Sequence, residues 1–220
     1  MVEDLLGTLY DWQELAGAIL GGLLALLVAW YVAKDARSRE ERAAAMIVVT
    51  ALVRLAGNYR TAKQYFEKGE DNPDKVAVNM AAMFALHSPT LSVSATAAIQ
   101  RLLLVNTQLA AHLSLLEMIN NEVDASLARW RQDIEDFVGS GEREFKRSSE
   151  TRLGDAKTIA RGTSTMVDHA ACAVLLLNRL VLSRFPTYHR LLLAVFPGKI
   201  EKMCREGLAV GNFKNPVPWD

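Results

Sequence analysis

The chain has 220 residues, of which 25 are basic, 25 are acidic and half are hydrophobic. A formal net charge of zero argues against a protein that binds nucleic acid through clustered Lys and Arg, and two cysteines are too few for a disulfide scaffold. The mean hydropathy of +0.09 is high for a soluble chain, which indicates a membrane segment.

The first predicted element is a transmembrane helix over residues 15–34. No charged residue occurs from 15 to 33, which is close to the roughly 20 apolar residues that a helix needs to cross a bilayer. Trp12 precedes this run, and Trp30 and Tyr31 lie near its end, where amphipathic aromatic rings favour the membrane interface.

The charges on the two sides of this segment differ. Residues 1–14 contain four acidic side chains and no basic one. Four basic residues follow the segment: Lys34, Arg37, Arg39 and Arg42. Because Lys and Arg are enriched on the cytoplasmic side, we expect a short non-cytoplasmic N-terminus over 1–14 and a cytoplasmic domain over 35–209, anchored in the inner cell membrane. A cleaved signal peptide would begin with a basic region instead.

Small residues recur at every fourth position of the segment, and positions four apart share one face of a helix. The predicted packing residues are Gly17, Gly21, Ala25 and Ala29. The GxxxG pattern lets two helix backbones approach closely in a membrane, so we expect a homo-oligomer. The alternative is that Gly and Ala are simply common in membrane helices.

The cytoplasmic part is predicted to be all-α, because its apolar residues recur at helical spacing without strand-like alternation. The first helix is expected to continue out of the membrane over 35–67. Residues 69–73 contain Gly69 and Pro73 and indicate a loop before a short helix over 74–86. Ser88 followed by proline favours the start of another helix at 89.

The longest predicted feature is a coiled-coil-like antiparallel hairpin of helices 89–138 and 142–185. The first helix carries apolar residues at heptad positions, and Asn106 and Asn120 interrupt one row. A buried Asn at such a position fixes register and partner number, although both could instead face a wet gap. Gly139 and Gly141 predict the turn. Residues 210–220 are expected to form an extended tail.

The tip of this hairpin is rich in charges of both signs and also contains Trp130, Phe137 and Phe145. Exposed aromatic residues surrounded by charge are typical of interfaces, which makes these three candidates for partner docking. The competing interpretation is a solvated pair of helix ends whose aromatic rings pack inward.

The sequence predicts no catalytic, cofactor-binding or metal-binding residue. His169 and Cys172 have ligand-compatible spacing for zinc, but two ligands do not make a structural site and no CxxC or HxxxH motif supplies the others. The apolar run that follows Cys172 favours a buried, inert thiol. Phosphate-binding glycine motifs and the GxSxG nucleophile elbow do not occur.

These observations predict a membrane-anchored, non-enzymatic helical bundle that acts as an oligomeric scaffold or adaptor. Its expected partners are the lipid bilayer, further copies of the chain and a docked protein, without nucleic acid. The alternative is a membrane-anchored sensor whose cytoplasmic bundle binds a small ligand, because bundle cores can host ligand sites. A weaker alternative is a membrane-active effector or pore former.

Overall fold

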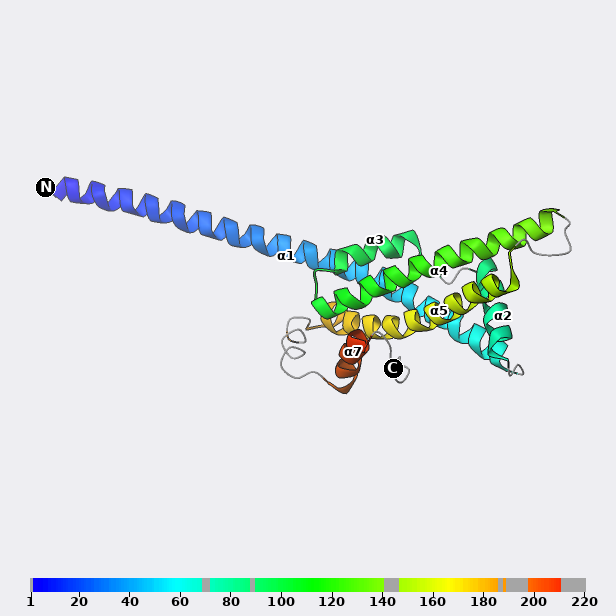
Figure 1. Ribbon diagram of the computed structural model, residues 1–220. Coiled ribbons are helices and arrows are strands. Elements are labelled where there is room, and N and C mark those ends of the chain that lie inside the picture. The colour runs from blue at the N-terminus through cyan, green and yellow to red at the C-terminus, as the bar shows by residue number, and fades with distance from the viewer. Residues whose placement is uncertain are drawn as a thin grey trace. The chain divides into compact units, whose positions relative to one another are not determined.

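The structure is a computed structural model that describes residues 2–68, 72–87, 90–140, 147–185, 188 and 198–210. Over these residues the secondary structure is helical, which confirms the predicted all-α class (Figure 1). The chain divides into two units, Met1–Glu41 and Arg42–Asp220, and helix α1 (Val2–Glu67) contributes to both.

The first unit contains the apolar part of α1. Its most apolar 18 residues have a mean hydropathy of 2.2, and none of them is buried. The helix is therefore long and apolar enough to span a membrane. After this stretch, Arg37 pairs with Glu41 at 2.9 Å and Arg39 pairs with Asp35 at 2.7 Å. These pairs lie four residues apart and stabilise the helix by a few tenths of a kcal/mol each.

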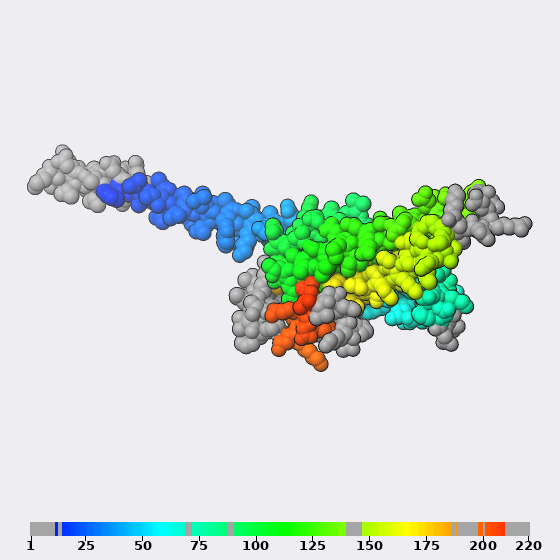
Figure 2. All heavy atoms as spheres, in the orientation of Figure 1, coloured from blue at the N-terminus to red at the C-terminus, as the bar shows by residue number. Residues whose placement is uncertain are grey.

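The second unit is a bundle built from the rest of α1 and six further elements. These are α2 (Pro73–Leu86), α3 (Val93–Leu102), α4 (Thr107–Ser140), α5 (Ser149–Leu177), the π-helical turn η1 (Asn178–Leu182) and α7 (Lys199–Val210). Figure 2 shows α7 lying against α5, and α7 contacts both α4 and α5.

The second half of α1 and α2 follow the sequence prediction closely. From Ala44 to Ala62 one face of α1 is buried in the core of the bundle. Asn72 caps α2, because its side chain accepts a hydrogen bond from the backbone N–H of Asp74 at 2.9 Å. Pro73 occupies the first helical position, where a missing N–H costs nothing.

The predicted continuous helix over 89–138 is wrong, because the chain breaks between α3 and α4. Asn106 causes this break locally: its Oδ1 accepts hydrogen bonds from the backbone N–H of Gln108 at 2.9 Å and of Leu109 at 3.1 Å. Asn106 therefore starts α4 as a capping residue. The helix before it begins at Val93 with Ser92 as its N-cap, and the expected start at 88–89 lies outside the described residues.

Asn120 is buried, and it binds the chain's own backbone. Its Oδ1 accepts a hydrogen bond of 2.7 Å from the backbone N–H of Leu91, in the segment before α3. A buried polar group of this kind is costly unless it is paired, and here the pairing fixes the α2–α3 connection on α4.

Helices α4 and α5 pack side by side and run antiparallel, since residues late in α4 contact residues early in α5 (Figure 1). The two helices approach closely at Gly162 of α5. A Cβ at this position would stand 2.6 Å from Cγ2 of Val123 and 3.5 Å from Cγ2 of Ile119, both on α4. The absence of a side chain at Gly162 therefore permits a tight contact between α5 and α4, and an added methyl group would have to displace the side chain of Val123.

Replacing Gly162 with Ala is expected to lower the free energy of unfolding by up to about 2 kcal/mol. Overpacking a close contact costs about 1–3 kcal/mol, and the gain of about 1 kcal/mol from replacing a helical glycine offsets part of it. Val123 is buried and β-branched, so it cannot turn away easily. Urea unfolding of the full chain in detergent micelles, followed by fluorescence, measures the change.

Gly154 provides the matched control, because it lies on α5 and nothing stands within 4 Å of an added Cβ among the described residues. Gly154→Ala is expected to stabilise the protein by about 0.5–1 kcal/mol. Equal effects of the two substitutions would contradict the close approach at Gly162.

At the other end of the α4–α5 pair, the charged side chains form an ion-pair network. Arg147 contacts both Asp133, at 3.1 Å, and Asp155, and Arg129 donates a 2.8 Å hydrogen bond to Asp155. Burial raises the pKa of Asp155, but the hydrogen bonds from Arg129 and Arg147 outweigh it and lower that pKa. The charges predicted to be solvated therefore connect the two helices.

Candidate functional site

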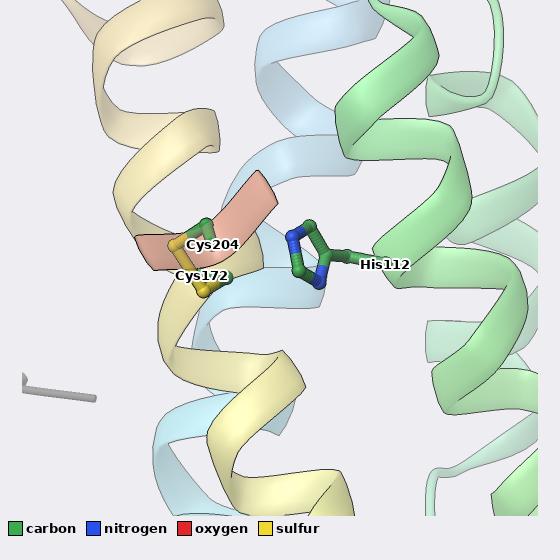
Figure 3. A group of neighbouring side chains, drawn as sticks. All are labelled: His112, Cys172 and Cys204. Atoms are coloured by element: carbon green, nitrogen blue, oxygen red, sulfur yellow. A yellow bond between two sulfur atoms is a disulfide. The ribbon is translucent and has the colours of Figure 1, made fainter. Parts of the chain in front are cut away.

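Four side chains with reactive or ligating groups meet in the core of the second unit. His112 lies on α4, His169 and Cys172 lie on α5, and Cys204 lies on α7. All four are at most 1% exposed. Figure 3 shows the ring of His112 pointing from α4 toward the two cysteines, and we call the four residues the His–Cys cluster.

Helical spacing places these side chains on the buried faces of their helices. His112 is three residues after Leu109 and four before Leu116, both of which are fully buried on α4. His169 and Cys172 are three residues apart and so lie one above the other on α5. Cys204 is on the face of α7 that packs against α4 and α5.

The two imidazoles contact one another directly. Nδ1 of His112 lies 2.9 Å from Nδ1 of His169, and the ring centroids are 5.2 Å apart. One of these nitrogens must donate and the other accept, so the contact requires that at least one Nδ1 carries no proton. Figure 3 shows the other ring nitrogen of His112 on the side that faces the cysteines.

Both imidazoles are held in the neutral form. Burial lowers the pKa of His112 from 6.5 to about 3, with a further contribution from His169 and an opposing one from a hydrogen bond with the Cys204 backbone. Burial also lowers the pKa of His169. A charged imidazolium would be poorly solvated in this core, and the neutral ring is the form that binds metals.

The two cysteines form a disulfide that joins α5 to α7 across a sequence separation of 32 residues. The interpretation of Cys172 as an isolated inert thiol is therefore wrong, because Cys204 lies against it. In the same region His112, Cys172 and Cys204 each offer one ligating atom, and these atoms lie within 4.8 Å of one another. The cluster can thus form a disulfide or, when reduced, present two thiols and an imidazole.

Polar contacts beside the cluster also hold α7 in place. Glu201 is 2% exposed and forms an ion pair with Arg179 of η1. Its backbone carbonyl accepts a hydrogen bond of 3.3 Å from the side chain of Gln108 on α4. Buried polar contacts and a disulfide therefore help to hold α7 in position.

Sequence reasoning brought together only two of these four residues, and it rejected them as a site. His169 and Cys172 were recognised from their spacing, whereas His112 and Cys204 are 57 residues before His169 and 32 residues after Cys172. Two features of the sequence pointed to the other two residues. His112 lies on the apolar face of its helix, and the chain contains one further cysteine besides Cys172.

The other predicted site residues do not join the cluster. Within the first unit, no atom lies within 4 Å of a Cβ built on Gly17 or Gly21, and Ala25 and Ala29 are exposed. At the predicted docking tip Trp130 is only 5% exposed and Phe137 is half-buried, while Phe145 lies outside the described residues.

The second unit also has an open groove of about 630 Å³ between α1 and the start of α3. Met46 and Ile47 of α1 line it and are 57% and 46% exposed. Arg54 on α1 and Ser92 before α3 add polar groups. A groove with apolar walls and a few polar groups is typical of binding sites.

No protein-family model, curated protein or solved structure matches this chain.

Proposed function

We propose that the protein is a single-pass membrane-anchored scaffold, non-enzymatic, that self-associates through its membrane helix and docks a partner protein on its cytoplasmic bundle. The observation that carries this proposal is the apolar segment of α1 in the first unit, whose most apolar 18 residues include no buried position. Exposing such an apolar helix to water is unfavourable, whereas the hydrocarbon core of a membrane accommodates its side chains.

Self-association is supported by the arrangement of the small residues along this helix. Gly17, Gly21, Ala25 and Ala29 follow one another at intervals of four and share one face. The open space beside Gly17 and Gly21 leaves room for a second backbone. Packing of this kind is a main source of helix association in lipid, where the hydrophobic effect does not favour it.

Replacing both Gly17 and Gly21 with Leu is expected to reduce the crosslinked dimer of the full chain in native membranes at least tenfold, because two isobutyl groups would hold the backbones apart. Gly22→Leu is the matched control, since residue 22 lies about 100° away around the helix. Undiminished crosslinking in the double variant, or an equal loss in Gly22→Leu, would rule out the stripe as the contact.

Partner docking is supported by the groove between α1 and α3. Met46, Ile47 and Val53 are large apolar side chains that are about half exposed on α1 within the second unit. Exposed apolar side chains beside polar groups are typical of protein interaction sites. The groove replaces the hairpin tip as the proposed docking surface, because Trp130 is buried.

A second candidate function is that of a membrane-anchored sensor. The His–Cys cluster favours it, because a reversible disulfide or a ligand in the bundle core would change how α7 is held on α4 and α5. Thermal unfolding of the full chain with added ligands tests this function, and an unchanged midpoint with metals and metabolites would count against it.

A further inference from the structure

The His–Cys cluster has the donor types of a transition-metal site. Thiolate sulfur and imidazole nitrogen are the ligands that zinc prefers in proteins. In a tetrahedral zinc site the ligand atoms stand about 3.3–3.8 Å apart. The ligating atoms of His112, Cys172 and Cys204 already lie within 4.8 Å of one another, so opening the disulfide leaves only small movements to reach this geometry.

The charge of this ligand set suits a buried position. A zinc ion bound by two thiolates and one neutral imidazole has no net charge, which removes most of the cost of burying an ion. The side chains of all three ligands are fully buried. The neighbouring charged pair, Arg179 and Glu201, is already neutralised within itself.

His169 has the position of a residue that supports a metal ligand. Its Nδ1 lies 2.9 Å from Nδ1 of His112, while the other nitrogen of His112 faces the cysteines (Figure 3). Metal-binding histidines usually donate their second N–H to a neighbouring acceptor, which fixes the orientation of the ring and its tautomer. An unprotonated Nδ1 on His169 provides that acceptor.

We propose that the reduced protein binds one zinc ion through Nε2 of His112 and the thiolates of Cys172 and Cys204, with water in the fourth position. His169 is a positioning residue that holds the His112 ring. The site is independent of the scaffold function proposed above, and its failure in the experiments below would leave the membrane helix and the groove unaffected.

Formation of the zinc site from the disulfide requires a phosphine, water and the metal ion. A phosphine and one water molecule convert the disulfide to two thiols and a phosphine oxide, which is a two-electron reduction of sulfur. Zinc then displaces the two thiol protons into solution. In the cytoplasmic orientation predicted here, the reduced form is also the resting form, because cytosolic thiols are kept reduced.

Bound zinc would take over the mechanical role of the disulfide. Both link Cys172 of α5 with Cys204 of α7, and zinc adds His112 of α4 to the same link. The metal is thereby expected to hold α7 against α4 and α5 in the reducing cell, where the disulfide is absent.

The direct test uses the full chain in detergent micelles, reduced with a phosphine, incubated with an excess of Zn²⁺ and desalted. Elemental analysis is expected to find one zinc per reduced chain and none in the oxidised chain. Cobalt in place of zinc is expected to give a thiolate-to-metal charge-transfer band and the intense visible bands of tetrahedral coordination. A reduced chain that retains no zinc and shows no thiolate band would overturn the proposal.

Substitutions separate the ligands from the supporting residue. Cys204→Ser and His112→Gln are expected to abolish retention of zinc on desalting, while His169→Gln is expected to weaken the affinity by about 10–100-fold and keep the stoichiometry at one. His87→Gln is the control, because His87 is exposed on another element and is expected to bind zinc like the wild type. Retention of zinc by Cys204→Ser with the thiolate band unchanged would exclude Cys204 as a ligand.

A second measurement uses the wild type and needs no variant. Zinc is expected to protect both cysteines of the reduced wild type from alkylation by at least tenfold in rate, and a chelator is expected to remove the protection. Alkylation of Cys172 and Cys204 at the same rate with and without zinc would contradict the site.

Discussion

Acidification from pH 7 to pH 5 is expected to lower the free energy of unfolding by about 2 kcal/mol through His112 alone. The pKa of this imidazole is about 3 in the folded protein against 6.5 in the unfolded chain, because it is buried beside His169. The unfolded chain therefore binds more protons over this range, and stability falls as the pH falls below 6.5. His169 acts in the same direction, since burial lowers its pKa as well.

The measurement is a series of urea titrations of the oxidised full chain in micelles, followed by tryptophan fluorescence, to which the buried Trp130 contributes. His112→Gln is expected to flatten the dependence between pH 7 and pH 5. Asp155 adds its own loss of stability at lower pH, because its pKa is lowered by Arg129 and Arg147. A wild type whose stability is constant from pH 7 to pH 5 would contradict the burial of neutral His112.

Reduction of the disulfide in the absence of metal is expected to lower the free energy of unfolding by about 3–4 kcal/mol. The cross-link between Cys172 and Cys204 closes a loop of 32 residues, and a loop of that length removes about this much free energy from the unfolded chain on the chain-entropy account. The effect is expected to concentrate at α7, because the disulfide joins this helix to α5. Hydrogen exchange of the amides in 199–210 is therefore expected to rise on reduction.

The control is the double variant Cys172→Ser and Cys204→Ser, whose stability should not respond to the reductant. Adding zinc to the reduced wild type is expected to restore part of the lost stability, because a ligand that binds only the folded state stabilises it. An unchanged unfolding midpoint on reduction of the wild type, or an equal drop in the double variant, would show that the disulfide does not hold α7.

The helices that sequence reasoning predicted well are those with strong local signals. The N-cap Asn72 and Pro73 mark the start of α2, and the long uncharged run marks the helix of the first unit. The break at Asn106 was missed because apolar residues continue in register on both sides of it, so the heptad pattern hides a local capping interaction. The heptad pattern favours one continuous helix here, but the hydrogen bonds that the side chain of Asn106 accepts start a new helix instead.

The candidate site depends on contacts that local patterns do not encode. His112 and Cys204 lie far from His169 and Cys172 in the sequence, and only the packing of α7 against α4 and α5 brings them together. Trp130, which the sequence predicted as a docking residue, is only 5% exposed, because the face of α4 that carries it packs into the bundle.

The most direct test of the scaffold function is site-specific photocrosslinking of the full chain in native membranes. A photoreactive residue replaces Ile47 in the groove, and the control replaces Met118 on α4, which is 60% exposed against 46% for Ile47. We expect the probe at 47, and not the probe at 118, to give one defined covalent complex with a second protein, whose mass is not a multiple of 24.3 kDa. Identical products from the two positions, or monomer alone from both, would contradict a docking groove on the bundle.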